Sequence, residues 1–395
     1  LMTPPVTRMV ILGVDPAFVS GCKLAVIDEN SNYLESAVIY PTEPRKDYEN
    51  SKNKVLQLTK KYNITGVAIG NGTGSRETQE FFARLNSEEK INLSYTVVSE
   101  AGASVYSASK LAQDEYPQLD VTIRGAISIA GRLRDPMATL VKIDPKSLGI
   151  GQYQHDVDQK LLEKKLDDVT SDLVNRVGVD INSASAALLS HVAGIGAKIA
   201  KNIIDFRDEN GNFTTKAQLL KVKGLGKKAY EQAAGFIRIK DGKNDFDNSG
   251  IHPESYLIAS KLKGEDLTTI DVREKASSIN VGVETLKDII KELLKPGFDP
   301  REDLPPIPFK EGLTDIKSLQ EGSFVSGVVR NIADFGAFVD IGLKNDGMIH
   351  ISKMSAKRIQ HPLEVLSLNQ YLPQIEVVSI DKEKGKIGLS LVLST

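Results

Sequence analysis

Residues 334–341 read Asp-Phe-Gly-Ala-Phe-Val-Asp-Ile and lie within a longer stretch, 323–393, of short strand-like runs separated by glycine-bearing turns. Such a pattern is typical of an all-β barrel. Successive side chains of a strand point to opposite faces, so Phe338 lies opposite Val339 and Ile341. If Val339 and Ile341 fill the barrel, Phe338 faces outward, where an aromatic ring is a stacking platform for an unpaired base.

The same stretch resembles the S1 domain, an OB-fold family that binds RNA. The segments that carry the resemblance, within residues 322–391, are Gly327-Val328-Val329, residues 334–341, Asp346-Gly347-Met348-Ile349-His350-Ile351-Ser352 and Ile387-Gly388-Leu389-Ser390. One departure is Asn369, where the family usually has glycine before the fourth strand. The resemblance implies an OB-fold barrel that favours single-stranded RNA.

The S1 resemblance also implies a set of ligand-binding residues. It places Phe335, Phe338 and His350 on the ligand face. We expect Arg330 and Lys386 to hold the backbone of the bound strand, because basic side chains pair with phosphate. The alternative, that both phenylalanines are core residues, is disfavoured by the length of the match.

An internal repeat lies in the middle of the chain. Leu189, Val192, Gly194, Gly196 and Lys198 recur in the same register as Leu219, Val222, Gly224, Gly226 and Lys228. This pattern resembles the helix-hairpin-helix motif, with tight hairpins at residues 194–196 and 224–226. Glycine, which has no Cβ, lets the backbone turn sharply and approach a phosphate closely. The helix that follows each hairpin begins with unpaired N–H groups that can point at the anion.

Positive charge is concentrated around this repeat. Residues 186–240 contain ten Lys or Arg and four Asp or Glu, although the whole chain has a net charge of −2. The lysines beside the hairpins include Lys198, Lys201, Lys227 and Lys228. The local excess favours contact with phosphates, and therefore little sequence preference. The alternative is a helical packing module whose hairpins touch only protein.

The first part of the chain has a different character. Residues 8–40 contain three strand-like runs, after which helix-like and strand-like segments alternate, and this predicts an α/β domain with a mixed sheet. Residues 10–27 resemble the first hairpin of the RNase H-like superfamily, in its YqgF and RuvC branch. The resemblance implies that Asp15, and Glu100 after a later strand, stand where relatives have metal-binding carboxylates.

A third carboxylate is missing from this set. In the nuclease branch an aspartate opens the last helix, but Arg124 stands there, and arginine cannot ligate Mg²⁺. Asp135 is expected at the far end of that helix. We expect a scaffold that lost its chemistry, with no metal or cofactor, in which Arg124 can pair with Asp15 or Glu100. The alternatives are a Mg²⁺-dependent nuclease using both carboxylates, and a simple turn role for Asp15 before Pro16.

Taken in order, these domains resemble one family along the whole chain, the bacterial Tex transcription accessory proteins. The supporting strings are Gly13-Val14-Asp15-Pro16, residues 70–78, residues 99–104, Asp135-Pro136, residues 149–156, residues 177–182 and Ile251-His252-Pro253-Glu254. The resemblance implies a role in transcription and an N-terminal helical region ahead of Leu1. Because the chain opens abruptly at Leu1, we expect a fragment of a longer protein.

The expected organisation has four parts: an RNase H-like domain (1–150), a helical region with tandem helix-hairpin-helix units (151–245), a helical segment with a linker (246–312) and the OB-fold barrel (313–395). Cys22 is the only cysteine, so no internal disulfide is possible. With no membrane-length apolar run and no secretory signal, we expect a cytoplasmic protein.

These features favour a non-catalytic transcription accessory protein that binds RNA, DNA or both with little sequence preference. The rivals are the nuclease and a scaffold that binds the transcription or translation machinery, such as RNA polymerase or the ribosome. Three histidines are given structural roles. We expect His155 to make hydrogen bonds in a loop, His191 to be packed and His252 to cap a helix.

Overall fold

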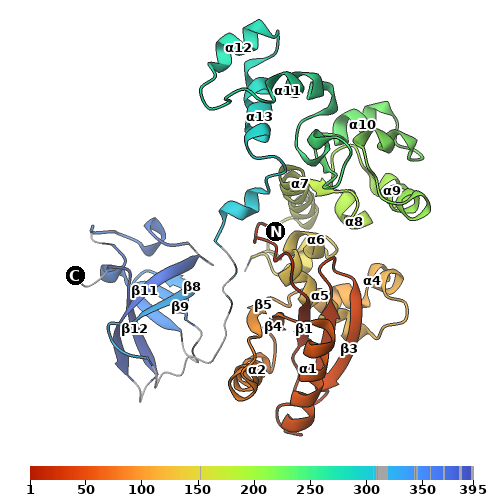
Figure 1. Cartoon of the computed structure of the whole chain (residues 1–395). Coiled ribbons are helices and arrows are strands. Elements are labelled where there is room, and N and C mark those ends of the chain that lie inside the picture. Colours follow the sequence, from red (N-terminus) through yellow and green to blue (C-terminus); the bar gives the residue numbers. More distant parts are fainter. Residues whose placement is uncertain are drawn as a thin grey trace. The chain divides into compact units, whose positions relative to one another are not determined.

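The computed structural model describes residues 1–151, 153–305, 307, 309, 319–341, 343, 346–355, 357–367, 370–381 and 385–392. The expected domain boundary at residue 312 and the departure at Asn369 lie outside these residues. Figure 1 traces an α/β part, two helical parts and a barrel. Among the described residues, no helix combines the length and apolar character needed to cross a membrane.

The α/β part is built on a five-stranded sheet with the order β3-β2-β1-β4-β5. Its strands are β1 (Ile11–Asp15), β2 (Cys22–Ile27), β3 (Tyr33–Ile39), β4 (Gly66–Gly70) and β5 (Ser94–Val98). β1 pairs with β4, and β4 with β5, in parallel. Every residue of β4 is buried, as expected for a central parallel strand. The carboxyl ends of β1, β4 and β5 therefore share one edge of the sheet, which is where ligands bind in open α/β sheets.

Six helices accompany this sheet: α1 (Tyr48–Tyr62), α2 (Ser75–Glu89), α3 (Ala103–Ala108), α4 (Lys110–Glu115), α5 (Val121–Arg134) and α6 (Pro136–Leu140). α3 and α4 are two separate helices, although they follow one another directly in the chain. At Ser109 the backbone is extended, with ψ 156°, and the Ser109 hydroxyl accepts a hydrogen bond from the Ala112 amide at 3.1 Å. A serine that caps a new helix cannot also continue the old one, so the segment breaks in two.

The first helical part contains α7 (Gln159–Val177), α8 (Ala186–Leu189), α9 (Ala197–Asn210), η2 (Lys216–Lys221) and α10 (Lys227–Ala233). A parallel pair of short strands, β6 (Val179–Asp180) and β7 (Ile237–Arg238), joins its two ends. The apolar positions of the repeat form its core. Leu189, Val192 and Ile195 are at most 2% exposed, and their counterparts Leu219, Val222 and Leu225 are at most 3% exposed.

The second helical part contains η3 (Asp245–Asn248), η4 (Pro253–Ser255), α11 (Tyr256–Leu262), α12 (Val272–Ser278), α13 (Val283–Leu294) and η5 (Pro300–Asp303). It has its own core, with Leu262 and Leu286 fully buried. The expected cap at His252 is confirmed, because its side chain accepts from the Glu254 amide at the start of η4.

The C-terminal part is a closed five-stranded barrel with the order β10-β12-β11-β8-β9. Its strands are β8 (Phe324–Ala333), β9 (Gly336–Asp340), β10 (Gly347–His350), β11 (Tyr371–Asp381) and β12 (Lys386–Ser390), with short turns η6 (Ile351–Lys353) and η7 (Pro362–Glu364). Val339 is fully buried and Ile341 is 7% exposed. The prediction that these two side chains fill the barrel is confirmed.

Candidate nucleic-acid interface

The outer face of β9 and β10 carries the aromatic residues of the barrel. Phe338 pairs in register with Met348 of β10, while the neighbouring Ala337, Val339 and Ile349 point into the fully buried core. Phe338 is therefore half-buried on the outside of the barrel. The alternation read from the sequence gives this orientation correctly, because the two-residue period of a strand is a local property.

Phe335 lies in the turn between β8 and β9 and is 53% exposed, which rules out a core role for it. Its ring meets that of Phe338 edge to face, with 6.1 Å between centroids and an interplanar angle of 89°. An exposed, ordered aromatic pair gives a base a flat surface without a large entropy cost. The edge-to-face contact fixes the two rings relative to each other.

His350 lies beside this pair. It is exposed and pairs across the strands with Gly336, next to Phe335. Its Nδ1 lies 2.9 Å from the Ser352 hydroxyl, which orients the ring. The three residues that the S1 resemblance assigned to the ligand face are thus brought together on one surface.

The two predicted phosphate contacts differ in their surroundings. Lys386 is exposed at the first position of β12. Arg330 is also exposed, but its Nη2 donates to Asp340 Oδ2 at 3.0 Å. Asp340 lies on the Phe338 face of β9, so Arg330 must leave this carboxylate before it can bind phosphate. The Asp340 partner follows from the cross-strand register, which the sequence motif does not show.

A further histidine on this surface was missed by sequence reasoning. His361 Nε2 lies 3.3 Å from Asp334 Oδ1, so the turn that carries η7 lies beside Phe335. The exposed Leu363 belongs to the same turn and is 62% exposed. No motif marks this turn, because its position depends on how the loop after β10 folds back.

The two helix-hairpin-helix units have nearly identical backbones. Gly194 and Gly224 have φ values of 81° and 84°, in the left-handed region that favours glycine. Gly196 and Gly226 are the N-caps of α9 and α10, with φ of −82° and −81°. Neither cap glycine offers a side chain to the first N–H groups of its helix, and a Cβ at either position would meet only open space. An approaching phosphate can therefore reach both helix starts.

The first glycine of the first hairpin also has a packing role. A Cβ on Gly194 would lie 2.8 Å from the Ala229 carbonyl and 2.9 Å from Gln232 Cβ, both on α10. In the opposite direction, Asn202 of α9 donates to the Lys223 carbonyl at 2.7 Å. The units therefore pack hairpin against helix, and Gly194 permits that packing. A Cβ on Gly196 or Gly226 would meet no such neighbour.

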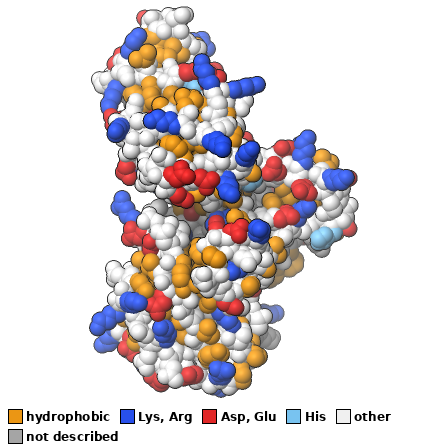
Figure 2. Space-filling view, turned by 90° about the vertical axis from the view of Figure 1, so that its right-hand side faces the viewer, with side chains coloured by type: hydrophobic (Ala, Val, Ile, Leu, Met, Phe, Trp, Pro, Cys, Tyr) orange, Lys and Arg blue, Asp and Glu red, His pale blue; other side chains and the backbone are white. Residues whose placement is uncertain are grey.

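The lysines around the open glycines are exposed. Lys198 and Lys201 lie on the first two turns of α9, and Lys227 and Lys228 open α10. Lys227 has a carboxylate partner at 3.9 Å, Glu231, but its side chain is 87% exposed, so the pair is weak and can exchange for phosphate. On the face that Figure 2 shows, acidic and basic side chains are interspersed.

The carboxylates of the α/β part follow two different strands. Asp15 is the last residue of β1, and Glu100 follows β5 by two residues. Both therefore belong to the carboxyl edge of the parallel strands, but β4 lies between β1 and β5. The simple turn role considered for Asp15 does not describe it fully, since it is part of a strand.

Two arginines of α5 have different surroundings: Arg132 interacts electrostatically with Glu100, whereas Arg124 donates to backbone carbonyls. Burial lowers the pKa of Arg132 on α5 to about 10, while the charge of Glu100 acts in the opposite direction. Arg124, at the start of α5, is buried and donates from Nε to the Tyr116 carbonyl at 3.1 Å. Its Nη1 donates to the Ser107 carbonyl. Sequence reasoning missed Arg132, whose place beside Glu100 depends on the packing of α5.

The residues present do not fit the pair of Mg²⁺ ions that RNase H-like nucleases use. Such a centre needs several converging carboxylates. Within the described part of the chain, no three His, Cys, Asp or Glu side chains come together in a way that could hold a metal ion. The buried guanidinium of Arg132 also attracts the negative charge of Glu100, and it therefore competes with a metal ion for that carboxylate.

Two other histidines lie outside these surfaces. His191 is partly buried in the first helix-hairpin-helix unit, with Nδ1 3.1 Å from the Ser171 hydroxyl, so the expectation that it is packed is confirmed. His155 lies in an exposed turn before α7.

Comparison with known protein families identifies each part. A Tex protein YqgF-like domain matches residues 9–134, a helix-hairpin-helix motif matches 174–238, an HHH domain matches 244–301 and an S1 RNA binding domain matches 318–391. The chain is thus a multidomain protein that joins an RNase H-like domain to helix-hairpin-helix and S1 modules.

Whole-chain relatives agree with this domain set. The chain is 45% identical to the transcriptional accessory protein Tex of Neisseria gonorrhoeae, over 100% of this chain and 53% of that protein. It is 44% identical to protein tex of Bordetella pertussis, over 100% of this chain and 51% of that protein. It is 45% identical to the uncharacterized protein YdcI of Bacillus subtilis, over 99% of this chain and 56% of that protein. The chain is thus similar along its whole length to the Tex transcription accessory proteins, and it spans about half the length of the curated relatives it matches.

Proposed function

We propose that this chain is the nucleic-acid-binding portion of a transcription accessory protein, and that it binds RNA or DNA with little sequence preference. The observation that carries the proposal is the Phe335–Phe338 pair on the outside of a closed barrel, in which Phe335 is 53% exposed and Phe338 is half-buried. Buried rings would serve the core, whereas exposed rings at fixed geometry suit the π-faces of unpaired bases. Single-stranded RNA is the favoured ligand at this surface, with His350 and Lys386 beside the stacked bases.

The helix-hairpin-helix pair supplies a second contact. Gly196 and Gly226 leave the starts of α9 and α10 open, and Lys198, Lys201 and Lys228 surround them. Backbone N–H groups and lysines bind phosphate without reading bases. The barrel would bind nucleic acid by stacking, and the helix-hairpin-helix pair would bind it by charge.

The RNase H-like domain acts in this proposal as a scaffold and not as a nuclease. Its support is the donor set, since the described residues form no group of three metal-binding side chains and Arg132 interacts electrostatically with Glu100. Family relatives named for transcription support a role on the transcription machinery. We infer that the chain works in the cytoplasm. Its partner there is RNA polymerase or, on the translation machinery, the ribosome.

The test is a binding titration of the whole chain with single-stranded RNA, single-stranded DNA and duplex DNA at several salt concentrations. We expect single-stranded RNA to bind most tightly, and the affinity for every ligand to fall linearly with the logarithm of salt concentration. Absence of binding to all three ligands at low salt would reject the proposal.

A further inference from the structure

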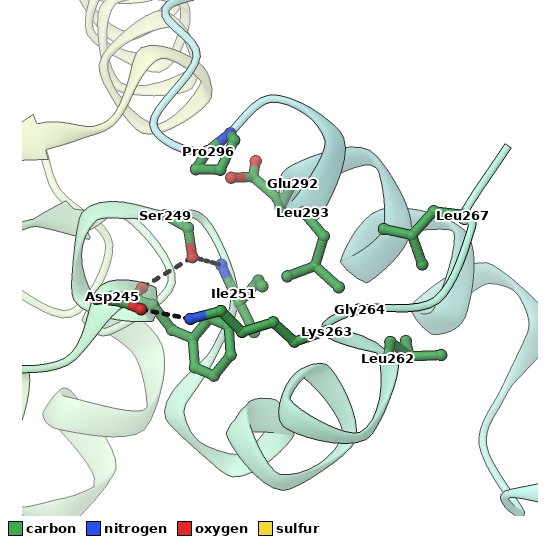
Figure 3. Close-up of a pocket in the computed structure, with 11 residues that line it drawn as sticks. Asp245, Ser249, Ile251, Leu262, Lys263, Gly264, Leu267, Glu292, Leu293 and Pro296 are labelled. Atoms are coloured by element: carbon green, nitrogen blue, oxygen red, sulfur yellow. Dashed lines mark hydrogen bonds and ion pairs between the residues drawn. The ribbon is translucent and has the colours of Figure 1, made fainter.

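The second helical part contains a cavity that the nucleic-acid-binding surfaces do not use. It has a volume of about 280 Å³ and lies between η3, the end of α11 and α13. Figure 3 shows Leu293 from α13 and Leu262 from α11 at its wall, with Leu267 further along the chain. Phe246 and Ile251 complete an apolar lining.

Charged groups surround the apolar interior. Asp245 and Lys263 form an exposed ion pair, and the hydrogen bond from Lys263 lowers the pKa of Asp245, which keeps the carboxylate charged. The Lys263 ammonium also lies 5.9 Å from the centre of the Phe246 ring. On the opposite wall, Glu292 accepts a hydrogen bond from the Gly250 amide at 2.7 Å. The lining therefore has two carboxylates and one ammonium around an apolar floor.

The module that holds this cavity has the opposite charge balance to the helix-hairpin-helix pair. Residues 244–301 contain eleven Asp or Glu and eight Lys or Arg. Residues 186–240, in contrast, contain four Asp or Glu and ten Lys or Arg. A phosphate backbone would be repelled by the first and attracted by the second. Although residues 244–301 match an HHH domain, their charge disfavours nucleic acid as the occupant.

The size of the cavity limits the occupant further. Sites for cofactors and drug-sized ligands measure about 300–1,000 Å³, so this cavity, at about 280 Å³, lies just below the small end of that range and has room for one large side chain. A single apolar side chain that fills a desolvated pocket, with complementary charges at the rim, is the arrangement of a protein-binding hot spot.

We propose that this cavity is a docking site for a segment of a partner protein that inserts one aliphatic or aromatic side chain and carries lysine or arginine beside it. The inserted side chain packs against Phe246 and Leu293, and the basic residue pairs with Asp245 or Glu292. This site goes beyond the proposed nucleic-acid binding, because it lies on a module that contributes no residue to either surface described above.

The test starts from a phage-displayed library of random 12-residue peptides, selected on the whole chain. Leu267→Trp is the counter-selection variant, because Leu267 is only partly buried and an indole there can fill the cavity. We expect enriched peptides to share an aliphatic or aromatic residue next to Lys or Arg. A fluorescent synthetic peptide of the enriched sequence is then titrated against the variants.

Asp245→Lys should weaken that peptide at least about tenfold, since two like charges would then face its basic residue. Asp245 is 77% exposed, so the fold should tolerate the change. The matched control is Glu284→Lys, an equally exposed acid on α13 that does not line the cavity, and it should leave the affinity unchanged. Circular dichroism and the unfolding temperature of each variant confirm that the module is folded.

Three outcomes would overturn the proposal: no enrichment over Leu267→Trp, enriched peptides without basic residues, or equal affinity for Asp245→Lys and the wild type. Displacement of the peptide by a single-stranded RNA oligonucleotide would assign the cavity to nucleic acid instead. Binding of RNA itself should be the same in Leu267→Trp and the wild type, so this proposal can fail while the proposed function stands.

Discussion

Arg301 and Asp135 are 166 residues apart in the sequence, and yet Arg301 Nη1 donates to Asp135 Oδ1 at 2.8 Å. The Arg301 side chain is 5% exposed and also donates to Asp299 at 2.7 Å. Burial acts to lower the pKa of Arg301, but the hydrogen bonds that it donates to the two aspartates, together with their charges, raise it above its ordinary value. Because Asp135 also caps α6, the pair ties η5 to the start of that helix. The Asp135-Pro136 string, one of the segments that carry the family resemblance, thus has a structural role, because it starts α6 and binds Arg301.

Arg301→Ala should therefore destabilise the region around α6 and η5 by about 3 kcal/mol, because it leaves two partly buried carboxylates without their partner. Native-state hydrogen exchange of the α6 amides measures the opening free energy locally, which suits a multidomain chain. Arg273→Ala, at an exposed arginine of α12, is the control and should change little. Unchanged exchange in Arg301→Ala would show that the pair is not needed for stability.

Replacing Phe335 and Phe338 with alanine should weaken binding of single-stranded RNA by about 1–3 kcal/mol for each lost stack. Fluorescence anisotropy with a labelled oligonucleotide gives the affinity. Phe324→Ala is a well-matched control, since Phe324 is also 53% exposed but lies at the far end of β8. Equal losses in the control and in the double variant would remove the stacking assignment.

The double variant Lys198→Glu, Lys228→Glu should weaken binding to all sequences alike and reduce the slope of log affinity against log salt. Each lysine that contacts a phosphate contributes about 0.9 to that slope with duplex DNA. The same titration with Lys261→Glu, an exposed lysine of α11, should give the wild-type slope. If the double variant has the same salt slope as the wild type, the hairpins contact protein and not phosphate.

We expect no Mg²⁺- or Mn²⁺-dependent cleavage of single strands, duplexes or four-way junctions. The physical reason is that no three metal-binding side chains come together in the described part of the chain, and that Arg132 interacts electrostatically with Glu100. Gel assays with end-labelled substrates measure this directly. Asp15→Asn, purified in parallel, separates the chain's own activity from a contaminating nuclease. Metal-dependent cutting by the wild type that disappears in Asp15→Asn would restore the nuclease alternative.

Lys216 gives a pH dependence to the helix-hairpin-helix part. The side chain is 1% exposed and donates to the Ser249 carbonyl at 2.9 Å, and burial lowers its pKa from 10.5 to about 7. Between about pH 7 and pH 10.5 the unfolded chain holds this proton and the folded chain has released it, so folding becomes more favourable as pH rises. Below about pH 7 both states hold the proton, and this dependence ends.

Lys216→Met should abolish that dependence, which approaches about 1 kcal/mol per pH unit within the window. Urea unfolding followed by circular dichroism at pH 7, 8 and 9 measures the difference between wild type and variant. Lys221→Met, at an exposed lysine of the same short helix, should keep the wild-type dependence. Parallel pH profiles for wild type and Lys216→Met would mean that Lys216 titrates normally in the folded chain.

The sequence by itself determined the features that depend on local geometry. Strand alternation gave the outward Phe338 and the buried Val339 and Ile341, because side-chain direction reverses at every residue of a strand. Spacing in the repeat likewise located both hairpins, because only glycine readily adopts the positive φ found at Gly194 and Gly224.

Only the tertiary structure decided which residues meet across the chain. The packing of Gly194 on α10, the Arg330–Asp340 pair, Arg132 near Glu100 and the Arg301–Asp135 joint all join segments that the sequence leaves separate. Each depends on the register and packing of whole elements, which a local pattern does not encode. The physical reason is that a residue's electrostatic partners are set by distance in space, whereas its secondary structure is set largely by its neighbours along the chain.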